Sequence, residues 1–131
     1  MPEQRARKYH QDRVAETLRE EIGAMIEGEL SDPRIASAYV TQVVLNPGGK
    51  SAMIYVAVEG EHDIEAREKA NIEGLMAARG YIRHELLERM GVRHVPELMF
   101  YSDRSERMTA RVEELLERQK KRQKKKTAEA L

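Results

Sequence analysis

The side chains of this sequence that could do chemistry are arginines, and the stretch that gathers them most distinctively, residues 77–86, reads AARGYIRHEL. Arg79 and Arg83 are four residues apart, so they share one face of a helix. Guanidinium groups beside a helix terminus are what a phosphate backbone needs for binding. Gly80 costs about 1 kcal/mol relative to alanine inside a helix, which indicates a break there. The stretch therefore predicts a phosphate-binding junction between two helices.

Two further arginines, Arg89 and Arg93, follow at the far end of the second expected helix and extend the same basic group. The alternative is a solvated helix face, on which Glu85 and Glu88 form ordinary salt bridges with the arginines. The sequence alone leaves both interpretations open.

Other kinds of site find little support in the sequence. The run Gly49-Lys50-Ser51 matches the end of a phosphate-binding loop, but Val44 stands where its first glycine belongs and a strand follows, so we interpret it as a hairpin turn. No serine stands in a G-x-S-x-G sequence, and adjacent helical carboxylates point apart. The histidines, which form no HxxxH pair, are His10, His62, His84 and His94. We therefore expect no enzyme activity and no metal site.

Composition indicates one soluble domain with a concentrated positive charge. The chain has 131 residues, 35% of them charged, and its 23 basic and 23 acidic side chains balance. Residues 118–126 read RQKKRQKKK, so a polyanion would bind there by counterion release. Cysteine is absent, and neither a secretory signal nor a membrane span is visible. The absence of cysteine is compatible with a reducing cytosol.

Hydrophobic periodicity predicts the elements that must position these arginines. Apolar residues from Val14 to Leu30 follow a helical spacing, and Asp32-Pro33 ends that helix. Residues 39–45 and 51–58 are rich in β-branched types and are joined by Asn-Pro-Gly-Gly, which predicts an antiparallel hairpin. Two helices, 64–78 and 81–90, follow, with Met76 among the residues expected to face inward. A third strand after Pro96 and a helix from Met108 complete the order.

The order helix-strand-strand-helix-helix-strand predicts an α+β fold of the type II KH kind. A KH domain normally clamps nucleic acid with a GxxG loop, and no two glycines here are three residues apart. Ala78-Arg79-Gly80 stands at the junction instead. We expect residues 1–107 to form the KH-like RNA-binding domain and residues 108–131 to form a C-terminal helix and a basic, flexible tail.

Several stretches in this order resemble the ribosome-binding factor A family of bacterial small-subunit maturation proteins. The resemblance covers roughly residues 5–117. The stretches that carry it are Arg13-Val14, Asp32-Pro33-Arg34, IYVAV at 54–58, AARGYIRHEL at 77–86, Val95-Pro96-Glu97-Leu98 with Phe100, Asp103 with Ser105, and RVEELL at 111–116. It implies that Ala78, Arg79 and Gly80 make an interhelical kink where other KH domains place GxxG.

The resemblance also implies a function and partners. The protein would act in the cytoplasm, without a cofactor, as a monomer that binds the free 30S subunit. It would support late maturation, including processing of the 5′ end of 16S rRNA, without catalysing the cleavage. The RNA-binding residues that we expect are Arg79, Gly80, Arg83, Arg89, Arg93, Arg5, Arg7, Lys8 and Arg13. The alternative is a protein-interaction module, in which the first helix or the 108–118 helix pairs with a partner helix and the lysines only aid solubility.

Overall fold

The computed structural model describes residues 2–130; within this range the side chains of residues 2–4, 6, 7, 9, 105–111, 129 and 130 lie outside the description. The helices are α1 (Pro2–Ala24), α2 (Ile64–Met90) and α3 (Ser105–Ala130), with a π-helical turn at Met25–Glu29 and a 3-10 turn at Pro33–Ile35. The strands are β1 (Ala38–Leu45), β2 (Ser51–Val58) and β3 (Glu97–Ser102).

The three strands form one mixed sheet in the order β1-β2-β3. β1 and β2 pair antiparallel, which confirms the hairpin, and β3 lies parallel to β2 with Ser51 opposite Glu97. Both glycines of the turn, Gly48 and Gly49, have positive φ, a conformation that side chains penalise. The turn sequence therefore fixes the register that the β-branched strands extend.

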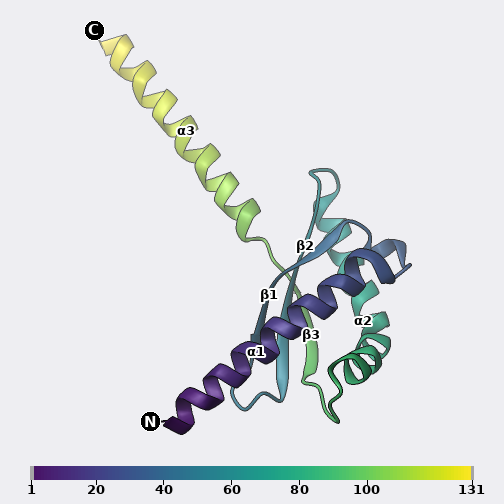
Figure 1. Cartoon of the computed structure of the whole chain (residues 1–131). Coiled ribbons are helices and arrows are strands. Elements are labelled where there is room, and N and C mark those ends of the chain that lie inside the picture. Colours follow the sequence, from purple (N-terminus) through teal and green to yellow (C-terminus); the bar gives the residue numbers. More distant parts are fainter. Residues whose placement is uncertain (1, 131) are drawn as a thin grey trace.

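The core lies between one face of the sheet and the helices α1 and α2. Alternate strand residues such as Ile54 and Phe100 point into it, as the period-2 pattern predicts. Leu18 and Ile22 of α1 are fully buried against them. Figure 1 shows both helices beside the sheet and α3 projecting away from it. The two-layer α+β arrangement is therefore confirmed, while its assignment as KH-like stays a prediction.

A glycine allows the 3-10 turn to pack closely against α2. Asp32 caps that turn by accepting from the backbone N–H of Arg34 at 2.9 Å, and Pro33 opens it. A methyl group added at Gly74 would lie 2.9 Å from Cγ1 of the buried Ile35. Gly74 therefore has a packing reason that its helix propensity alone would not suggest.

The expected junction at Gly80 is wrong, because α2 is one continuous helix from Ile64 to Met90. A glycine costs only about 1 kcal/mol in a helix interior. Burial of Leu75 and Ile82 on either side of it recovers more than that. Figure 1 shows that the ribbon of α2 is not straight. The kink predicted at Ala78, Arg79 and Gly80 would thus be a bend within one helix, and it stays a prediction.

The C-terminal helix begins earlier and continues further than expected. α3 starts at Ser105, three residues before the predicted helix start at Met108, and remains helical through the basic residues 118–126 to Ala130. The segment expected to be a flexible tail is thus helical in the structure. Lysine, arginine and glutamine are good helix formers, and no glycine or proline interrupts them.

Candidate nucleic-acid interface

Three cations from two distant parts of the chain line one hollow of about 550 Å³, which we call the basic hollow. They are Lys50 at the end of the hairpin turn and Arg79 and Arg83 of α2. Gly80 and Met76 line the same hollow. Met76 is 44% exposed, so its expected inward orientation is wrong. The structure thus brings together two predicted RNA-binding arginines and the predicted glycine.

Sheet register explains why Lys50 joins the arginines. Lys50 precedes β2, and its carbonyl accepts from the backbone N–H of Glu97 at 2.9 Å, where β3 begins beside it. α2 packs against β3 and therefore presents its arginines at the same end of the sheet. Lys50 is not among the predicted RNA-binding residues, because the run Gly49-Lys50-Ser51 matches only the end of a nucleotide-binding motif. The one feature of the sequence that could have identified Lys50 as a phosphate-binding residue is its position in a hairpin turn.

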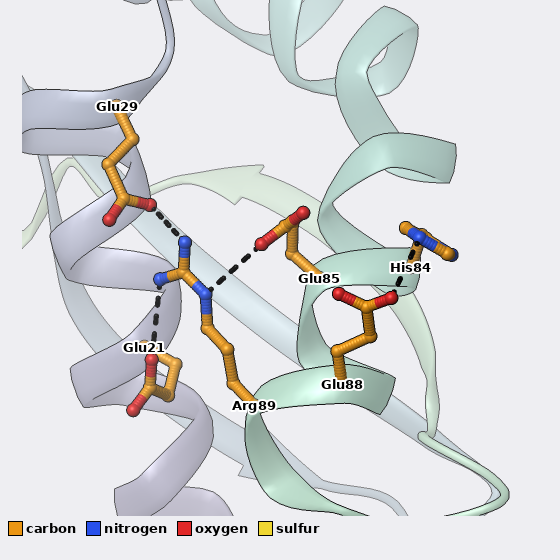
Figure 2. A network of polar contacts seen from close by, with 6 residues as sticks. All are labelled: Glu21, Glu29, His84, Glu85, Glu88 and Arg89. Atoms are coloured by element: carbon orange, nitrogen blue, oxygen red, sulfur yellow. Dashed lines mark hydrogen bonds and ion pairs between the residues drawn. The ribbon is translucent and has the colours of Figure 1, made fainter.

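The charge in the basic hollow is not neutralised by the neighbouring carboxylates. Glu85 accepts from Arg89, and Glu88 lies 3.4 Å from Nε2 of His84, so neither acid pairs with the arginines of the hollow (Figure 2). Within the described part of the chain, Arg79 and Arg83 make no hydrogen bond or ion pair. In that part of the chain, the salt bridges to Glu85 and Glu88 that the alternative expected are therefore not made by these two side chains. Their ten N–H donors are available to phosphate oxygens or to water.

The hollow has one acid of its own. Glu97 lines it beside Lys50 and stands at the start of β3. The formal balance of its lining is three positive charges against one negative. A phosphate chain would therefore meet a net attraction there, and Gly80 adds no side chain that would hold the phosphate away from the α2 backbone.

Arg89 lies at the far end of α2, as predicted, and it is paired with carboxylates. Figure 2 shows its guanidinium group between three carboxylates, with Glu29 at 2.6 Å, Glu85 at 3.3 Å and Glu21 at 3.5 Å. The hydrogen bond that it donates to Glu29, above the other contacts, raises the pKa of Arg89 from its ordinary value. Arg89 therefore ties α2 to α1 and the π-helical turn, and its RNA contact stays a prediction.

The other predicted RNA-binding residues lie outside the basic hollow. Arg93 is exposed in the loop between α2 and β3, and Arg5, Lys8 and Arg13 are exposed along α1. The side chain of Arg7 lies outside the described residues. A second hollow of about 500 Å³ joins His10 of α1 to the hairpin turn and to His94 of that loop, and Lys50 lines both hollows. RNA binding by Arg93, Arg5, Arg7, Lys8 and Arg13 stays a prediction.

One part of the protein-interaction alternative is wrong. The apolar face predicted for the first helix is buried in the protein's own core through Leu18 and Ile22, so that face is not open to a partner helix. Among residues 2–130, no helix is long and apolar enough to cross a membrane. Among the side chains that the structure describes, no three histidines or carboxylates gather as metal ligands would.

Comparison with known proteins gives consistent matches. The family model for ribosome-binding factor A matches residues 10–116. Ribosome-binding factor A of Koribacter versatilis is 53% identical over 122 residues, covering 93% of this chain and 97% of the relative. The crystal structure of that factor from Thermus thermophilus matches with a TM-score of 0.60 at 23% identity, covering 70% of this chain and 93% of the other. A Thermus thermophilus model fitted into the map of a complex with the 30S subunit matches with a TM-score of 0.55 at 25% identity, covering 68% and 90%.

Proposed function

Since this chain belongs to the ribosome-binding factor A family, we propose that it is a non-catalytic assembly factor that binds the free 30S ribosomal subunit. The observation that carries the proposal for its own surface is the basic hollow, where Lys50, Arg79 and Arg83 converge. A related factor has been fitted into the map of a 30S complex, which supports the choice of partner.

The contact that we propose is with the phosphate backbone of 16S rRNA. Two guanidinium groups on one helix face can each donate a pair of hydrogen bonds to phosphate oxygens, and a lysine opposite them adds a positive charge. Such contacts position RNA without reading its sequence, as is sufficient for a factor that recognises one fixed place on a subunit. Arg93, with Arg5, Lys8 and Arg13 of α1, would extend the contact beyond the hollow.

The cellular role that we propose follows from binding. By holding rRNA in late assembly, the protein would support maturation of the small subunit, including processing of the 5′ end of 16S rRNA by a separate nuclease. It would do so as a monomer in the cytoplasm, with no cofactor.

Charge reversal in the basic hollow tests the proposal. Arg79→Glu with Arg83→Glu should weaken binding to purified free 30S subunits roughly tenfold or more, because two phosphate contacts become repulsive. The readout is the fraction of protein that sediments with subunits over a titration. The matched control reverses two exposed charges elsewhere, Arg19→Glu with Lys69→Glu.

The control separates local contact from general charge. An equal loss in both double variants would mean that only net charge matters, and unchanged binding in the first would remove the hollow from the interface. Lys50→Glu alone should produce an intermediate loss, since it removes the cation on the opposite wall.

A further inference from the structure

We propose that α3 folds back over the open face of the sheet and carries its basic segment, residues 118–126, to the end of the molecule where the basic hollow lies. The occupant of the open face is thus the protein's own C-terminal helix. The extended arrangement in Figure 1 is then the undocked form.

The open face of the sheet is the face that α1 and α2 do not cover. Its large side chains on β2 and β3 are Met53, Tyr55, Met99 and Tyr101, and Ser51, Ala57 and Glu97 alternate onto the same face. Met99 and Tyr101 are 36% and 39% exposed, and the rings of Tyr55 and Tyr101 lie 5.8 Å apart between centroids. A sheet normally buries a face of this composition against another layer.

α3 carries the matching surface, an apolar stripe of Val112, Leu115 and Leu116. These residues recur at steps of three and one, the spacing of a helix face that packs on a core. Each is more than half exposed in the extended arrangement. Burial of such a stripe stabilises the docked helix by about 25 cal/mol for each Å² of apolar surface removed from water.

The lengths of the two elements agree. α3 follows β3 after two residues, Asp103 and Arg104, so a returning helix must run antiparallel to β3. Twelve helical residues, Ser105 to Leu116, span about 18 Å. The six residues of β3 span about 20 Å. The stripe therefore ends where the strand begins, and the chain becomes basic directly beyond that point.

Contacts of the connecting residues hold the start of α3 at the end of β3. The backbone N–H of Asp103 donates to the carbonyl of Val56 at 2.8 Å, and its carboxylate accepts from Oγ1 of Thr41 at 2.6 Å. Arg104 lies 3.4 Å from the carboxylate of Glu68 on α2. The extended and the docked arrangements of α3 would therefore differ only in the direction that the chain takes at the start of α3.

Docking places opposite charges together. Arg118 lies 13 residues beyond Ser105, or about 20 Å along the helix, level with Glu97 at the start of β3. The remaining basic segment would then extend past the hairpin turn, next to Lys50. This enlargement of the RNA interface rests on the proposed function, whereas the docking itself does not.

Disulfide trapping tests the docking, and the absence of cysteine makes the chain suited to it. Val112 and Met99 lie at the same level of the docked pair, about 10 Å from where each element meets the link. Met99→Cys with Val112→Cys, oxidised by copper phenanthroline in the free full-length protein, should form an intramolecular disulfide. Its rate should exceed that of the control pair Met99→Cys with Glu114→Cys roughly tenfold, since residue 114 faces the opposite side of α3.

The outcomes decide the proposal without reference to RNA. Equal rates for the two pairs, or disulfides only between two chains, would overturn it. Adding Leu115→Glu and Leu116→Glu should abolish the rate advantage, because the docked stripe would then bury charge. The trapped protein should bind free 30S subunits at least as tightly as the reduced one, and a loss of binding on trapping would overturn the proposed placement of the basic segment.

Discussion

Replacing Gly80 with alanine is expected to raise the free energy of unfolding by about 0.5–1 kcal/mol. Gly80 is interior to α2 and is not among the glycines with positive φ, so alanine can adopt its backbone conformation. A methyl group there would meet no atom within 4 Å beyond the helix itself. The gain comes from the unfolded chain, which has fewer conformations to lose when glycine is absent.

A second glycine in the same helix is the matched control. A methyl group at Gly74 would lie 2.9 Å from Cγ1 of Ile35 and 3.1 Å from Cβ of Arg34. Ile35 is buried and cannot move aside freely, so Gly74→Ala should cost about 1–3 kcal/mol. The two substitutions have the same chemistry and the same helix, and they should change stability in opposite directions.

Thermal and urea unfolding, followed by circular dichroism, measure both variants. For a chain of this size, the Gly80→Ala gain corresponds to a rise in Tm of about 2–5 °C. A loss of stability in Gly80→Ala comparable to that in Gly74→Ala would refute the reasoning. It would show that α2 needs at residue 80 a conformation that alanine resists, as the predicted interhelical kink requires.

Two further predictions concern the ion pairs. Arg89→Met should lower Tm clearly more than Arg93→Met does, because the first leaves three carboxylates facing one another and the second removes an exposed loop charge. The side-chain hydrogen bond from Arg34 lowers the pKa of Asp32 below its ordinary 3.8, so this carboxylate stabilises the fold above that pH and the contribution is lost as the pH falls through the lowered pKa. Asp32→Asn should therefore lower Tm at pH 7. Between pH 5 and pH 3 the Tm of this variant should fall less than the Tm of the wild type. Parallel curves of Tm against pH for the two proteins would contradict this.

Local patterns were sufficient for most of the elements. The β-branched runs and the Asn-Pro-Gly-Gly turn predicted the hairpin, since strand propensity and turn chemistry act between neighbours in sequence. The same reasoning failed at Gly80, where a local penalty of about 1 kcal/mol is outweighed by burial on both sides. The burial depends on which residues meet the core, and a propensity count does not contain that information.

The candidate site was predictable in part for a similar reason. Arg79 and Arg83 stand close together in sequence, so helical spacing identified them. Lys50 is 29 residues from Arg79 and joins it only because β3 pairs parallel with β2. The position of Arg89 within α2 does not distinguish it from an arginine on the surface. Two of its three carboxylate partners, Glu21 and Glu29, lie 60 or more residues away in sequence, so the pattern within α2 could not reveal them.

The salt dependence of binding tests the central claim most directly. For the wild type and for a triple variant, Lys50→Ala with Arg79→Ala and Arg83→Ala, the affinity for free 30S subunits is measured between about 50 and 200 mM salt, where counterion release governs phosphate contacts. If the basic hollow holds phosphates, the slope of log K against log salt becomes shallower by roughly 2–3 in the triple variant. An unchanged slope would contradict the account, because the three cations would then contact no phosphate in the complex.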